Sequence, residues 1–137
     1  MKMGKIASIY ADNIYLTDDN PRYENPEKIR NDINKGINAK KIKEISNRAI
    51  AISEAIKNLK SGDVLVIAGK GHENIQEIGK KKIKFSDRKK ILTEIQKKNK
   101  NLSNQLKINI IKELSKTQKL SKSISINKAR ISSNEVK

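Results

Sequence analysis

The strongest structural signal in this chain is the stretch Val64-Leu65-Val66-Ile67-Ala68-Gly69-Lys70-Gly71-His72-Glu73. Its first five residues are continuously apolar and rich in β-branched side chains, which is typical of a parallel strand covered on both faces. The glycines that follow let the backbone turn tightly as it leaves such a strand. We therefore expect a central strand over 64–68 that runs into a polar, glycine-rich loop.

The sequence before this stretch alternates between helix and strand signals. Asn25 followed by Pro26 is a helix start, because Asn caps a helix and Pro suits its first position. Ser46 and Asn47 precede a second apolar stripe and offer another cap. We expect helices over 3–10, 26–37 and 47–59, and strands over 13–17 and 41–45. This alternation predicts an α/β domain with a mostly parallel sheet.

The sequence after the glycine-rich loop predicts a hairpin and a last helix. Two strand-like runs, 75–78 and 82–85, flank Gly79-Lys80-Lys81, so we expect an antiparallel edge. Ser86 and Asp87 then cap a helix. From about Asn99 the chain is strongly basic with few structural signals. We therefore expect one domain over 1–98 and a basic linker or tail over 99–137.

The composition excludes several classes of function. The chain has no cysteine and one histidine, so neither a zinc–thiolate site nor a histidine-based metal cluster is expected. No apolar run approaches the length of a membrane span, and a soluble cytoplasmic protein is the default. The formal charge of +16 suggests nucleic-acid binding as a possible function. Only 3% of the residues are aromatic and arginine is scarce, which argues against it. Lysine is used here as a general surface residue.

Two polar loops follow predicted strands, and they are the candidate site. Thr17–Arg22 presents Asp19, Asn20 and Arg22, while the glycine-rich loop presents Gly69, His72 and Glu73. If both strands belong to one parallel sheet, their carboxyl ends meet at the same edge. An arginine suits a carboxylate and a glutamate suits an ammonium, which together would fit an amino acid.

Each loop also has a plainer interpretation. Asp, Asn and Pro are ordinary turn residues, so Thr17–Arg22 could simply be a capped turn. Gly69-Lys70-Gly71 lacks the spacing of a phosphate-binding loop. His72 is more typical of a hydrogen-bonded loop residue than of a catalytic base.

Several motifs taken together resemble the C-terminal domain of the Mur ligases. They are, in chain order, Met3-Gly4-Lys5-Ile6-Ala7, Ala11-Asp12, Thr17-x-Asp19-Asn20-Pro21-Arg22, Ile33, Arg48-Ala49-Ile50, Ala68-Gly69-Lys70-Gly71-His72-Glu73 and Phe85-Ser86-Asp87. The resemblance covers about residues 3–95. It implies a Rossmann-like α/β fold, in agreement with the alternation of helices and strands.

The resemblance also implies which residues bind substrate. The loop Asp19-Asn20-Pro21-Arg22 would recognise meso-diaminopimelate, with Arg22 pairing the carboxylate at the far end of that amino acid. Gly69 and Glu73 would contact the same ligand. Lysine-adding members resemble this sequence but lack the arginine, so Arg22 favours the diaminopimelate-adding branch. No residue of this chain is implied as a catalytic nucleophile or as a metal ligand.

The family reaction is an ATP-dependent amide ligation in peptidoglycan synthesis. Its branch that uses meso-diaminopimelate joins it to UDP-N-acetylmuramoyl-L-alanyl-D-glutamate through an acyl phosphate. The resemblance implies ATP and Mg²⁺ as cofactors, bound mainly by a central domain that this chain lacks. It implies the remaining Mur ligase domains as partners, with the C-terminal domain holding the incoming amine.

The sequence leaves the status of the chain open. The first part of the domain is missing, so the chain looks N-terminally incomplete, and a fragment that is inactive alone is expected. Residues 123–137 have a short resemblance to the opening of the next Mur ligase, which suggests a fused polypeptide. The alternatives are a small basic nucleic-acid-binding module and a non-functional gene remnant.

Overall fold

A computed structural model describes the backbone of residues 2–134 and the side chains of residues 2–116. The elements in chain order are α1 (Lys2–Tyr10), β1 (Ile14–Leu16), α2 (Pro26–Asn34), the short 3-10 helix η1 (Ala39–Lys41), β2 (Ile42–Glu44), α3 (Arg48–Asn58), β3 (Ile75–Ile78), β4 (Lys81–Lys84) and α4 (Asp87–Asn134). The contacts within the chain divide it into two units, 1–98 and 99–137. The candidate site lies in the first unit.

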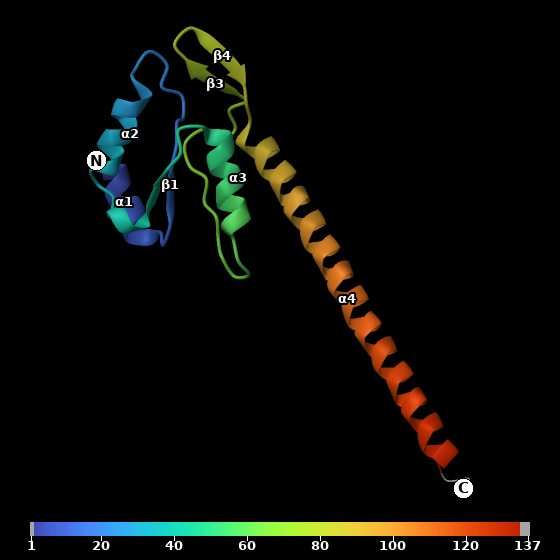
Figure 1. The fold of residues 1–137 in the computed structure, drawn as a ribbon. Coiled ribbons are helices and arrows are strands. Elements are labelled where there is room, and N and C mark those ends of the chain that lie inside the picture. The colour runs from blue at the N-terminus through green and yellow to red at the C-terminus, as the bar shows by residue number, and fades with distance from the viewer. Residues whose placement is uncertain (1, 135–137) are drawn as a thin grey trace. The chain divides into compact units, whose positions relative to one another are not determined.

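The first unit is built around a parallel pair of strands. β1 pairs with β2 so that Ile14 lies opposite Ile42. Helices α1 and α2 lie on one side of this pair and α3 lies on the other (Figure 1). The α/β class and the parallel pairing predicted from the sequence are confirmed.

The two predicted helix starts have the expected caps. The side chain of Asn25 accepts a hydrogen bond from the backbone N–H of Lys28 at 3.2 Å, and Asn47 accepts one from Ile50 at 3.1 Å. Each bond satisfies an N–H group that has no partner within its helix. The buried apolar core is formed mainly by α3, with one residue from β1, and consists of Leu16, Ala51, Ile52, Ala55 and Ile56.

The predicted antiparallel hairpin is also present. β3 pairs with β4, with Ile75 opposite Lys84 and Ile78 opposite Lys81. Within the described residues it forms its own two-stranded sheet beside the parallel pair. A single parallel bridge joins Arg22 to Ile78, so the hairpin is attached to the loop that follows β1.

The predicted central strand over 64–68 is wrong. The structure has no strand there, and the side chains of Val64 and Val66 are 86% and 81% exposed. A buried parallel strand needs a neighbour on the sheet and cover on both faces. The two sheets among residues 2–134 contain only β1 with β2 and β3 with β4, so this segment has no ladder to join.

The segment after residue 98, which the sequence predicts to be a basic linker or tail, is part of the helix α4, which continues to Asn134. No glycine or proline occurs between Asp87 and Asn134, so the sequence contains no strong helix breaker there. The short resemblance seen over 123–137 lies outside the residues whose side chains are described. No helix in the described part of the chain is long and apolar enough to cross a membrane.

Candidate functional site

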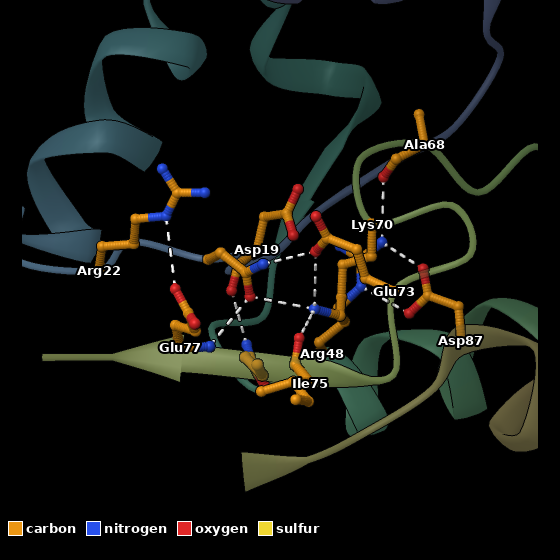
Figure 2. Close-up of polar contacts among 11 residues, drawn as sticks. Asp19, Arg22, Arg48, Ala68, Lys70, Glu73, Ile75, Glu77 and Asp87 are labelled. Atoms are coloured by element: carbon orange, nitrogen blue, oxygen red, sulfur yellow. Dashed lines mark hydrogen bonds and ion pairs between the residues drawn. The ribbon is translucent and has the colours of Figure 1, made fainter. Parts of the chain in front are cut away.

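The two polar loops predicted as a site lie against each other in the structure. The side-chain amide of Asn20 donates a hydrogen bond to Glu73 Oε2 at 2.6 Å, across 53 positions of sequence. Lys70 joins both, since its ammonium donates to Asn20 Oδ1 at 3.0 Å and lies 3.5 Å from Glu73 Oε2. Figure 2 shows Lys70 and Glu73 within this network of polar contacts.

The hairpin holds the first loop in place through the backbone. The N–H of Arg22 donates to the carbonyl of Glu77 at 3.1 Å, and the side chain of Gln76 donates to the carbonyl of Asp19 at 2.9 Å. Pro21 is buried, and Arg22 has a φ of +51°, an unusual value for a residue other than glycine. The loop therefore has a defined conformation that strand β3 helps to impose.

Arg22 presents its side chain to solvent at the edge of this cluster. The side chain is 70% exposed, and its Nε lies 3.5 Å from Glu77 Oε2. An exposed ion pair at this distance is weak, because water competes for both charges. The guanidinium is therefore available to another carboxylate (Figure 2).

Gly69 lies against the Asp19 carboxylate of the first loop. Its φ is +114°, and a Cβ atom built there would lie within the contact distance of the Asp19 carboxylate. Only glycine fits a position with this backbone conformation and this neighbour. Oδ1 of Asp19 is buried and has no hydrogen-bond partner among the described residues.

A buried ion pair between Arg48 and Asp87 supports the start of the glycine-rich loop. Arg48 donates to both oxygens of Asp87, from Nε at 2.8 Å and from Nη2 at 2.7 Å, and to the carbonyl of Ala68 at 3.0 Å. Burial alone would lower the pKa of Arg48. The hydrogen bonds and charge of Asp87, with the charge of Asp19, outweigh that effect and raise the pKa. Arg48 therefore stays charged and fixes the residue before Gly69.

A second arginine fixes the start of the first loop. Arg30 on α2 pairs with Asp18 and donates from Nε to Glu44 Oε1 at 2.7 Å. The hydrogen bond to Glu44 raises the pKa of Arg30, with Asp18 adding to it against the opposing effect of burial. The loop is thus anchored at Asp18 by α2 and at Arg22 by the hairpin.

The structure brings together most of the residues that the sequence predicted. Asp19, Asn20, Gly69 and Glu73 lie in one cluster, Arg22 lies at its edge, and Pro21 is buried as part of the loop backbone. His72 is exposed. This arrangement could hold an ammonium group at Glu73 and a carboxylate at Arg22.

The sequence interpretation missed the residues that hold this cluster together. They are Lys70, the backbone of Glu77, and the pair Arg48 and Asp87. Arg48 and Asp87 both belong to motifs quoted above, so two opposite charges within those motifs were a usable signal for an ion pair. Lys70 gave only the weaker signal of a lysine between two glycines.

No residue of the described part of the chain is assigned to ATP or Mg²⁺. No group of three acidic or histidine side chains that could hold a metal ion occurs among them. The ammonium of Lys70 is directed to Asn20, Glu73 and the carbonyl of Ile75, so it cannot act as a phosphate-binding lysine.

The chain belongs to a family of ligase domains. Residues 1–71, about half of the chain, match the family described as "Mur ligase, glutamate ligase domain". This match agrees with the parallel pair β1–β2 and with the position of the loop that follows β1.

Relatives of known name point to one kind of Mur ligase. The chain is 54% identical over 85 residues to the UDP-N-acetylmuramoyl-L-alanyl-D-glutamate--2,6-diaminopimelate ligase of Rickettsia typhi. The matched region covers 62% of this chain and 17% of that protein. It is 47% identical over 98 residues to the enzyme of the same name from Chlorobium phaeobacteroides, covering 72% and 19%. The chain therefore spans less than a fifth of the length of these relatives.

A solved structure gives the same result for the fold. It is titled as a UDP-N-acetylmuramoyl-L-alanyl-D-glutamate--2,6-diaminopimelate ligase, with a TM-score of 0.60 and 40% sequence identity. The match covers 65% of this chain and 19% of that one. The predicted Mur ligase C-terminal fold is confirmed.

Proposed function

We infer that this chain is the amino-acid-binding part of an ATP-dependent ligase that adds meso-diaminopimelate to UDP-N-acetylmuramoyl-L-alanyl-D-glutamate. The observation that carries this proposal is the cluster of Asn20, Lys70 and Glu73, with the exposed Arg22 at its edge. The names of the relatives, which contain both substrates, support it. The product of such a reaction belongs to peptidoglycan biosynthesis.

The charges of the site match the two ends of that amino acid. Both contacts of Glu73 use Oε2, so Oε1 is directed to no described residue and can accept a bond from a ligand ammonium. Arg22 offers a planar fork of donors that suits a carboxylate. Lysine has no carboxylate at its far end, so Arg22 would select meso-diaminopimelate over lysine.

The contribution of this chain to the reaction is orientation. Held by both ends, the amino acid would present one amine to an activated carboxylate, which lowers the entropic part of the barrier. The ATP and Mg²⁺ of the family reaction would be bound mainly by other Mur ligase domains. Those domains and the UDP-linked dipeptide are the proposed partners.

A titration followed by NMR tests the proposal on the chain itself. We expect meso-diaminopimelate to shift the backbone resonances of Asn20, Arg22, Gly69 and Glu73, with smaller changes elsewhere in residues 2–98. Single- or double-stranded oligonucleotides serve as the comparison, because the rival function is a basic nucleic-acid-binding module. Shifts by nucleic acid alone, or shifts by the amino acid confined to other residues, would contradict the proposal.

A further inference from the structure

Lys70 is the most deeply buried charged side chain of the candidate site. Its side chain is 0% exposed, although it lies on a loop between Gly69 and Gly71, both of which have positive φ. A lysine is rarely buried to this extent unless its charge is paired, because removing an ammonium from water is costly. The burial therefore requires an explanation in terms of its partners.

The partners of Lys70 come from three different segments. The ammonium donates to Asn20 Oδ1 at 3.0 Å and to the backbone carbonyl of Ile75, and it lies 3.5 Å from Glu73 Oε2. These are the first loop, the start of strand β3 and the glycine-rich loop. An ammonium has three donors, and each of them has one acceptor here, so none remains for a ligand.

The contacts of Lys70 determine which atoms of Asn20 and Glu73 a ligand would meet. Asn20 Oδ1 also accepts the backbone N–H of Glu77 at 3.0 Å. With two donors on its oxygen, the amide of Asn20 must direct its nitrogen toward Glu73 Oε2, which lies 2.6 Å away. The atoms left without a hydrogen-bond partner among the described residues are then the second N–H of Asn20 and the Oε1 atom of Glu73.

We propose that Lys70 is the positioning residue of the amino-acid site, which orients the Asn20 amide and the Glu73 carboxylate without touching the ligand. This proposal rests on the proposed function of the site. It goes beyond that function, because it assigns the role of the glycine-flanked lysine to preorganisation of two ligand-binding side chains. The positive charge of Lys70 also partly balances the negative charge of Glu73. The ligand ammonium would therefore meet an oriented carboxylate that attracts it less strongly than an unpaired carboxylate would.

The first arm of the test uses no ligand. In the unsubstituted chain, we expect the ¹⁵N signal of the Lys70 ammonium to be observable and protected from exchange near neutral pH, whereas exposed lysines exchange quickly. Lys70→Met keeps the length of the side chain and removes its donors, so the two amide protons of Asn20 should move to the shifts of a free asparagine. Lys43→Met is the matched control, because Lys43 pairs with Glu54 at 3.2 Å on the surface.

The second arm uses meso-diaminopimelate. Lys70→Met should weaken its binding by about tenfold or more, as expected for losing hydrogen bonds to a charged group, while Lys43→Met should not change it. A folded Lys70→Met chain that keeps either the Asn20 shifts or the affinity would overturn the proposal. A rapidly exchanging Lys70 ammonium in the unsubstituted chain would overturn it too, even if the variant fails to fold.

The two arms also separate this proposal from the proposed function. If Asn20 and Lys70 behave as expected but meso-diaminopimelate does not bind, the network is right and the assigned ligand is wrong. If the ligand binds and Lys70→Met has no effect on it, the site is right and the role of Lys70 is wrong.

Discussion

Two cationic side chains lie at the two ends of the candidate site, and their surroundings differ sharply. At one end Lys70 has a fully buried side chain with acceptors on three segments, whereas at the other end Arg22 is 70% exposed and has one ion pair at 3.5 Å. This difference separates their roles. The donors of the buried cation, Lys70, already have acceptors within the protein, whereas the exposed cation, Arg22, is available to a ligand. In this site, the buried charge therefore supports other side chains, and the exposed charge beside a rigid loop is placed to recognise the ligand.

The largest expected effect comes from removing a buried charge that supports the site. Arg48→Met should lower the free energy of unfolding by about 3–5 kcal/mol, because Asp87 is left buried without its partner. Lys35→Met is the control, since the Lys35–Asp32 pair has the same 2.7 Å separation but both side chains are more than half exposed. Urea unfolding measures both, and equal losses would contradict the distinction between buried and exposed pairs.

A smaller loss of stability is expected at Gly69, where a positive φ is combined with close contact to the site. Gly69→Ala should destabilise the chain by about 1–3 kcal/mol through its positive φ and should also displace the Asp19 carboxylate. Gly62→Ala has comparable strain at a φ of +89°, but a Cβ there would meet no other atom within 4 Å. Both variants should lose stability, while only Gly69→Ala should lose binding of meso-diaminopimelate. Loss of binding in Gly62→Ala would contradict this.

The smallest effect is expected at the exposed end. Glu77→Gln removes the carboxylate that competes with the ligand for Arg22, so the affinity for meso-diaminopimelate should rise by at most about fivefold, the limit for an exposed ion pair. Glu54→Gln is the control, since Glu54 is also 32% exposed and pairs with a surface lysine. Calorimetric titration checks both, and a fall in affinity in Glu77→Gln would mean that Glu77 helps to hold Arg22 in place.

Local signals in the sequence were sufficient for much of the fold. Asn25 and Asn47 cap their helices as expected, because a cap depends only on the next few residues. The hairpin around Gly79 was predicted for the same reason. The apolar run from Val64 to Ala68 failed as a predictor, because it records a preference for burial and not the presence of a neighbouring strand.

The candidate site was predicted only in part, for a related reason. Asp19, Asn20, Arg22, Gly69 and Glu73 were proposed because they belong to two polar loops that follow predicted strands, and the family resemblance then implied their ligand. The burial of Lys70 depends on the carbonyl of Ile75 and on Asn20, which meet only when the hairpin folds over the first loop. No local pattern records that meeting.

The ratio of the affinities for meso-diaminopimelate and L-lysine tests the central claim most directly. In the unsubstituted chain we expect meso-diaminopimelate to bind about tenfold more tightly, the contribution of a charge-assisted pair with Arg22. Arg22→Ala should reduce this ratio to near one by weakening meso-diaminopimelate alone, with stability little changed at a site that is 70% exposed. Equal affinities in the unsubstituted chain, or a preference that survives Arg22→Ala, would contradict the account.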